Sequence, residues 1–134
     1  MQTDTRAAPV SKGMLIAGWI VTALPVAMLL MSGVMKFVKP APVVETFKHL
    51  EWDQSAALTL GIIELICTAI YVFPRTSVLG AVLLTGYLGG ATATHVRIGD
   101  PVVQFAAPVV FGVLVWLGLY LRDPRLRALL PLRS

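Results

Sequence analysis

One acidic residue, Glu64, lies inside the apolar stretch "LTLGIIELICTAIYVF" of residues 58–73. A charged side chain at the centre of a membrane helix costs about 2.5–3.5 kcal/mol on insertion scales, so it normally faces the interior of a bundle and has a partner. Intramembrane carboxylates often bind a ligand or exchange a proton, and we therefore predict that Glu64 is a catalytic residue. The alternative is a structural partner for Lys36, His95 or Arg97.

Further polar residues lie where the neighbouring apolar segments end. Lys36 is close to the end of the first segment, and His95 ends the third. Thr85, Thr92 and His95, with Leu88 between them, follow helical spacings of three and four and so share one helix face. We predict His95 as a second catalytic residue. The predicted ligand-binding residues are Lys36, Arg97, Asp100, Gln104, Thr92 and Thr85.

Several of these residues also have simpler explanations. Lys36 could extend its ammonium group toward the membrane surface. The dipole at a helix C-terminus favours His95 as a structural residue. Asp100 followed by Pro101 is typical of a helix start, with Asp100 as the N-cap and proline at the first helical position.

Other chemistries find little support in the residue inventory. The single cysteine, Cys67, excludes an internal disulfide and is expected to be a small core residue. A typical zinc site needs a second imidazole within the apolar segments, so we predict no metal site. No serine triad, phosphate-binding loop or dinucleotide fingerprint is present.

The composition indicates a membrane protein. Apolar residues make up 57% of the 134 residues and charged residues only 13%, against about 25% charged in average chains. The net charge of +4 is spread between apolar segments and at the termini, without a basic helix face. We therefore expect a lipid bilayer as the environment and no nucleic-acid partner.

Four apolar segments are long enough, or nearly so, to cross about 30 Å of hydrocarbon. They comprise residues 14–37, 55–73, 78–95 and 102–121. The fold class predicted is an all-α integral membrane protein, a bundle of four transmembrane helices within residues 14–121. Spacings of three and four in the first long connection predict a short interfacial helix there.

The distribution of lysine and arginine sets the predicted orientation. Seven basic residues lie on the side that holds both termini and the second connection, against four on the opposite side. Both termini are thus predicted to be cytoplasmic, as an N-terminal tail of residues 1–13 and a basic C-terminal tail of residues 122–134. Glu64 then lies about 13 Å into its helix from the outer side, near the midplane, beneath a cavity that opens outward.

Three quoted stretches carry a family resemblance: "MSGVMKF", "LGIIELICTAIYVFPRTSVLGAVLL" and "GGATATHVRIGDP". With Gly33, Lys36, Gly61 and Glu64 in their positions, the chain resembles the DoxX-like family of small four-helix bacterial membrane proteins. The resemblance implies a multi-pass protein of the bacterial inner membrane, similar to a subunit of thiosulfate:quinone oxidoreductase.

The resemblance favours one function among three. The first is a membrane subunit of an oxidoreductase system that binds a small or amphiphilic molecule, a quinone or a sulfur compound, and works with partner oxidoreductase proteins. With this function, a quinone is a possible cofactor, and the protein could form a homo-oligomer. The second is a membrane enzyme that acts alone by acid–base chemistry on a lipid-like substrate, as an isomerase, hydrolase or cyclase. The third is a structural scaffold or assembly factor.

Overall fold

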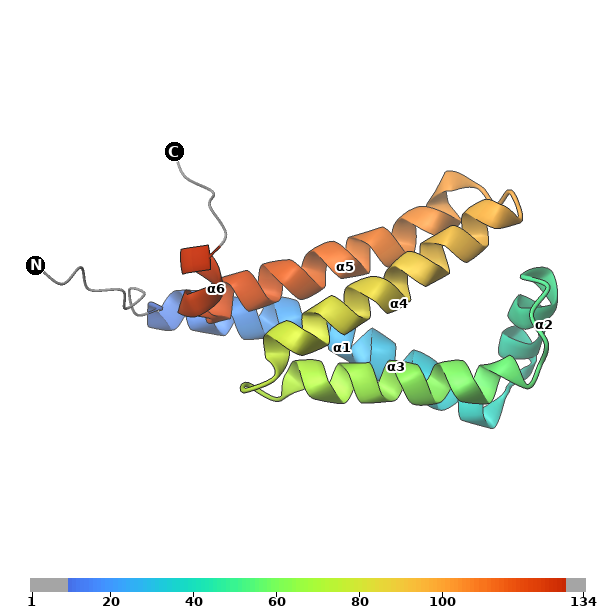
Figure 1. The fold of residues 1–134 in the computed structure, drawn as a ribbon, viewed down its shortest axis with the longest axis horizontal. Coiled ribbons are helices and arrows are strands. Elements are labelled where there is room, and N and C mark those ends of the chain that lie inside the picture. The colour runs from blue at the N-terminus through green and yellow to red at the C-terminus, as the bar shows by residue number, and fades with distance from the viewer. Residues whose placement is uncertain (1–9, 130–134) are drawn as a thin grey trace, which may run out of the picture.

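The computed structural model describes residues 10–129, and that part of the chain forms helices and no strand (Figure 1). The prediction of an all-α fold is confirmed. The helices are α1 (Lys12–Val38), α2 (Ala41–His49), α3 (Ala56–Val72), α4 (Ser77–Arg97), α5 (Val102–Arg122) and α6 (Pro124–Leu129). A short helix, α2, lies in the first long connection, where the sequence predicts one.

Local sequence explains where α1 begins and ends. The side chain of Ser11 accepts a hydrogen bond from the backbone N–H of Met14 at 3.2 Å, which caps the first turn. At the other end, Lys39 has left-handed backbone angles and its N–H donates to the carbonyl of Met35. Pro40 follows at once and cannot continue the helix. The chain therefore turns here into α2.

The four long helices form a ring in which each helix packs against two neighbours. α1 contacts α3 and α5, and α4 contacts α3 and α5. Successive long helices run in opposite directions, with α2 at one end of the bundle and α6 at the other (Figure 1). The end with α2 is called the α2 end below.

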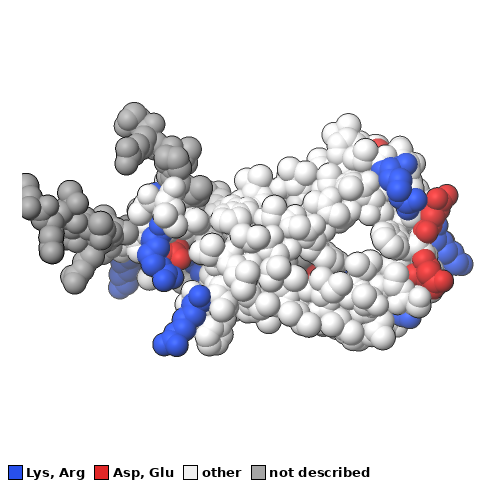
Figure 2. Space-filling view, viewed as in Figure 1, with Lys and Arg blue, Asp and Glu red and all other residues white. Residues whose placement is uncertain are grey.

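The outer surface of the bundle is apolar. Among the described residues, α1, α4 and α5 are long and apolar enough to cross a membrane, and α3 is a shorter apolar helix of 17 residues. Large hydrophobic side chains of all four helices are exposed, and Figure 2 shows charged groups at the two ends with an uncharged belt between them. Such a surface matches a lipid bilayer.

Glycines bring the helices together at the α6 end. A Cβ on Gly80 of α4 would lie 2.3 Å from backbone atoms of Tyr71 in α3, and one on Gly118 of α5 would lie 2.4 Å from Oγ1 of Thr22 in α1. Small residues permit this approach in membranes, where dispersion contacts replace the hydrophobic effect. The buried apolar core lies beside these crossings and includes Leu84 and Leu119.

A charged side chain is buried among these packed helices. Arg122, assigned to the tail by the sequence, is the last residue of α5 and only 9% exposed. Its Nε donates to Oγ1 of Thr22 at 3.1 Å, and its guanidinium lies 4.3 Å from the ring centroid of Trp19. A cation over an aromatic face is stabilised by the ring quadrupole, which compensates part of the desolvation.

The α2 end is more open. Gly86 and Gly90 of α4 have no atom within 4 Å of the position a Cβ would take. Figure 2 shows the surface hollowed near this end, beside the charged residues. The bundle thus has a tightly packed half and a half that holds a cavity.

Candidate functional site

Glu64 and Lys36 form a buried ion pair between α3 and α1. The Nζ of Lys36 lies 2.6 Å from Oε2 of Glu64, and the side chain of Glu64 is only 2% exposed. Lys36 sits in the last turn of α1, and Glu64 lies in the middle of α3. The pairing with Lys36 was one of the alternatives raised by the sequence.

Two glycines allow α1 and α3 to approach closely enough for this pair. A Cβ on Gly61 would lie 3.0 Å from Cβ of Lys36 and 3.1 Å from the carbonyl oxygen of Gly33. A Cβ on Gly33 would lie 2.6 Å from the side chain of Leu65. Lys36 thus comes three positions after Gly33, and Glu64 three positions after Gly61. The close contact of the helices at these glycines brings the two charged side chains together.

Two hydroxyl groups complete the polar cluster. Tyr87 of α4 donates to Oε2 of Glu64 at 3.0 Å. Lys36 donates to Oγ of Ser32 at 2.7 Å, and Ser32 in turn donates to Oε2 of Glu64 at 3.4 Å. These hydrogen bonds compensate part of the desolvation that burying the ion pair costs. Sequence reasoning did not select Tyr87.

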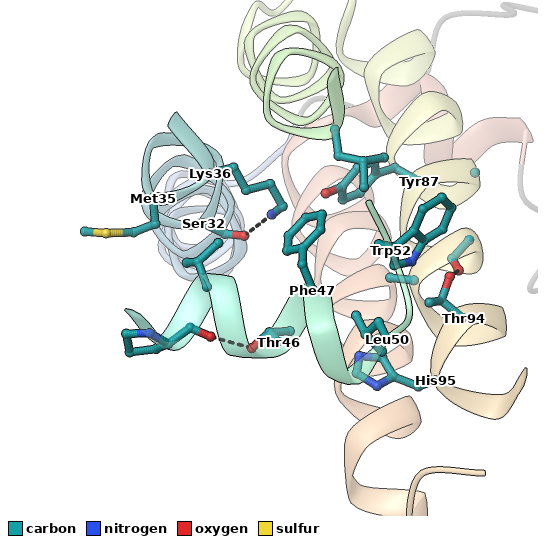
Figure 3. Close-up of a pocket in the computed structure, with 16 residues that line it drawn as sticks. Ser32, Met35, Lys36, Thr46, Phe47, Leu50, Trp52, Tyr87, Thr94 and His95 are labelled. Atoms are coloured by element: carbon teal, nitrogen blue, oxygen red, sulfur yellow. Dashed lines mark hydrogen bonds between the residues drawn. The ribbon is translucent and has the colours of Figure 1, made fainter. Parts of the chain in front are cut away.

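A cavity of about 640 Å³ lies beside this cluster at the α2 end. Ser32, Lys36 and Tyr87 form part of its wall, while Glu64 lies behind them. Figure 3 shows Phe47 of α2 between Lys36 and Tyr87, with Trp52 beside Tyr87. Most of the lining residues are apolar, with a few polar groups among them. The volume falls in the range of about 300–1,000 Å³ that small-molecule sites occupy.

A second polar cluster lies where α2 meets the connection between α4 and α5. Nδ1 of His95 and Nε2 of His49 each lie 2.6 Å from a different oxygen of Asp100. The hydrogen bond from His95 lowers the pKa of Asp100, with a smaller contribution from His49. Of these three residues, His95 lines the cavity.

Asp100 does not cap α5, and that interpretation is wrong. The residue at the N-cap is Pro101, and no side chain caps this helix start. Both oxygens of the Asp100 carboxylate are instead bonded to the two histidines. Two imidazole partners satisfy both carboxylate oxygens of Asp100, whereas a capping interaction would satisfy one of them with a backbone N–H.

The other predicted ligand-binding residues lie apart from the Glu64 cluster. Arg97 donates to the backbone carbonyl of Leu50 at 2.7 Å and so ties the end of α2 to α4. Thr85 and Thr92 line a different pocket of about 580 Å³, between α4 and α5. Gln104 is exposed near the start of α5. Within residues 10–129, no three His, Cys, Asp or Glu side chains are arranged to hold a metal ion.

Comparison with known proteins identifies the family. The family model described as the DoxX-like family matches residues 20–118. The chain belongs to the DoxX-like family. No curated protein and no solved structure matches the chain. The matched range contains Lys36, Glu64, Tyr87 and His95. The family and the apolar helices together identify a multi-pass membrane protein.

Proposed function

We propose that this DoxX-like protein binds a small amphiphilic molecule in the cavity at the α2 end, with the polar part of the molecule against Lys36 and Tyr87. One observation carries the proposal. Lys36, whose ammonium group is paired with the buried carboxylate of Glu64 behind it, forms with Ser32 and Tyr87 a polar patch on the wall of a largely apolar cavity. Apolar walls with a few convergent polar groups are typical of small-molecule sites.

The donors at this site suit an acceptor oxygen on the ligand. An ammonium group has three N–H donors, and Lys36 spends two of them on Ser32 and Glu64. The third has no partner among residues 10–129 and can bond a carbonyl or oxyanion in the cavity. A quinone carbonyl and an oxygen-bearing sulfur compound both offer such an acceptor, and these are the ligand classes that we propose.

The position of Glu64 suits proton exchange with such a ligand. Its carboxylate does not line the cavity, but Lys36 and Tyr87 both contact it and both line the cavity. Lys36 could give a proton to the ligand and regain one from water that enters the cavity, while the carboxylate of Glu64 favours the charged form of Lys36. In this proposal Glu64 supports the transfer, and Lys36 and Tyr87 contact the ligand.

We place this activity in a membrane subunit of an oxidoreductase system. The protein would cross the bacterial inner membrane four times, with both termini in the cytoplasm and the cavity open to the outer side. Because Cys67 is the single thiol, redox chemistry would use the bound molecule or a partner oxidoreductase. Turnover by the purified protein without a partner would favour instead a membrane enzyme that acts alone.

Native mass spectrometry of gently solubilised protein tests the binding function. The wild type is compared with the double variant Lys36→Met/Glu64→Leu, which removes both charges and leaves no unpaired one. We expect a bound small molecule on the wild type, identifiable after release, and its loss from the folded double variant. Wild-type protein without ligand in every mild detergent and in nanodiscs would contradict the proposal.

A further inference from the structure

The ring of His95 is held by one nitrogen, and the residue lines the cavity at the α2 end. Nδ1 lies 2.6 Å from Oδ2 of Asp100, whose other oxygen lies 2.6 Å from Nε2 of His49. The side chain of His95 is 18% exposed and that of Asp100 only 6%, whereas His49 is 62% exposed. Asp100 is thus enclosed between an inner and an outer imidazole.

This arrangement determines which nitrogen of His95 carries the proton. An ionised carboxylate only accepts hydrogen bonds, and the lowered pKa of Asp100 keeps it ionised at neutral pH. The nitrogens that face it, Nδ1 of His95 and Nε2 of His49, therefore both carry hydrogen. In a neutral imidazole the other nitrogen is then a bare acceptor, and for His95 this is Nε2.

The opposite ends of the cavity consequently differ in hydrogen-bonding character. Figure 3 shows Lys36 and Tyr87 on either side of Phe47, and His95 away from both of them, beside Leu50. Thr94 also lines the cavity near His95, but its hydroxyl donates to the carbonyl of Gly90 at 2.8 Å. Among the described residues, no donor is bonded to Nε2 of His95.

We propose that Asp100 is a positioning residue that fixes His95 with Nε2 unprotonated, and that Nε2 binds ligands through an O–H or N–H group. The inference rests on the proposed binding function and adds a requirement to it. The ligand carries an acceptor for Lys36 at one end and a hydrogen-bond donor for His95 at the other. A quinol, a hydroxylated quinone or another hydroxylated amphiphile has this chemistry, whereas a quinone with carbonyl groups alone lacks the donor.

The first part of the test reads the two imidazoles directly. The chain contains only two histidines, so ¹⁵N-histidine NMR in nanodiscs resolves both, and His49→Asn assigns them. We expect His95 with hydrogen on Nδ1 and His49 with hydrogen on Nε2, and in Asp100→Asn a shift of His95 toward the Nε2–H form. A wild-type His95 with hydrogen on Nε2 would overturn the inference.

The second part measures ligand preference with two probes of similar shape, 2-naphthol and 2-methoxynaphthalene. Only 2-naphthol has an O–H, so we expect it to bind about two- to tenfold more tightly and to shift the Nε2 signal of His95. The variant His95→Asn keeps an N–H for Asp100, but its amide oxygen is held closer to the backbone and does not reach the position of Nε2, so this variant should bind both probes equally. His49→Asn should retain the preference.

The outcomes separate the two proposals. Equal binding of both probes to the wild type would overturn the role of His95 while leaving the cavity as a binding site. Binding of neither probe would contradict the binding function itself and the inference with it. A preference for 2-naphthol that persists in His95→Asn would assign the acceptor to another group and overturn the inference.

Discussion

At the residue scale, the sequence indicates a pairing of Glu64 with a cation, because an isolated charge in a membrane has a high free-energy cost. Glu64 stands out in an apolar helix, and Lys36 is among the few cations close enough along the predicted topology to pair with it. Whether the carboxylate faces the cavity could not be predicted, since this depends on the rotation of α3. The structure places Glu64 behind Lys36 and Tyr87.

The threonine stripe shows why polarity alone misplaces residues in membrane helices. The hydroxyls of Thr85 and Thr92 donate to Ala81 and Leu88 carbonyls of their own helix at 2.7 and 2.9 Å. A threonine satisfied in this way needs no polar surroundings. Tyr87 cannot satisfy itself locally, and its hydroxyl reaches Glu64 on another helix. Length and reach, rather than polarity, distinguish Tyr87 from the threonines.

Removing one charge of the buried pair should destabilise the protein strongly. Lys36→Met leaves the Glu64 carboxylate buried without its cation, which we expect to lower the free energy of unfolding by about 3–5 kcal/mol. Lys36→Met/Glu64→Leu should recover most of this loss. Denaturant unfolding of both variants in the same detergent measures the difference. Equal destabilisation in the two would mean that the pair does not act as a unit.

At the element scale, glycines determine where the helices pack closely and where they leave space. The close crossing of α3 and α4 depends on Gly80, and the open half of α4 contains Gly86. Both glycines lie within one helix, so the sequence does not distinguish them. Only the helix rotation in three dimensions shows that Gly80 faces Tyr71 and that Gly86 faces the cavity.

Gly80→Ala and Gly86→Ala should therefore have opposite effects. The new methyl group at position 80 would meet the backbone of Tyr71, which forces α3 and α4 apart and should cost about 1–3 kcal/mol. At position 86 it meets no atom within 4 Å, and the higher helix propensity of alanine should make the change neutral or slightly stabilising. Thermal unfolding of the two variants side by side checks this contrast.

Polar contacts fix the C-terminal end of α2 to the bundle. His49 bonds Asp100, and the side chain of Arg97 bonds the carbonyl of Leu50 and lies 3.8 Å from Glu51. The pKa of Asp100 in the folded protein lies below its ordinary value of 3.8. The stabilisation that the Asp100 carboxylate gives to the attachment of α2 is therefore fully present above that value. It is lost only as the pH falls through the lowered pKa.

The mobility of α2 should consequently depend on pH only in strong acid. A spin label on Glu45→Cys in a Cys67→Ser background should show constant mobility from neutral pH down to about the ordinary aspartate value, and greater mobility below it. Asp100→Asn should increase the mobility at every pH. A change in the wild type near the ordinary histidine pKa instead would assign the attachment to the imidazoles alone.

At the scale of the whole molecule, composition predicted the environment and the helical class, while the cavity came from the structure. A 57% apolar chain with 13% charged residues has too little polar surface for water. The cavity at the α2 end exists because the glycines on the helix face turned toward it, Gly86 and Gly90, have no other helix packed against them. Hydropathy does not report this, since lipid-facing and cavity-facing side chains are equally apolar.

The proposed orientation is testable on the full chain. We expect green fluorescent protein fused after residue 134 to fluoresce and alkaline phosphatase at that site to be inactive, because the basic side of a membrane protein stays in the cytoplasm. Alkaline phosphatase inserted between residues 53 and 54, in the connection between α2 and α3, should be active. The reverse pattern would place the cavity on the cytoplasmic side.

The central claim is that the cavity at the α2 end holds a small molecule, and a matched pair of glycine variants tests it most directly. Gly90 lines that cavity and Gly89 lines the pocket between α4 and α5, and a Cβ on either meets no atom within 4 Å. Native mass spectrometry should find the small molecule on the wild type and on Gly89→Leu, and should find it absent from folded Gly90→Leu. A ligand retained by Gly90→Leu and lost from Gly89→Leu would contradict the account and move the site to the other side of α4.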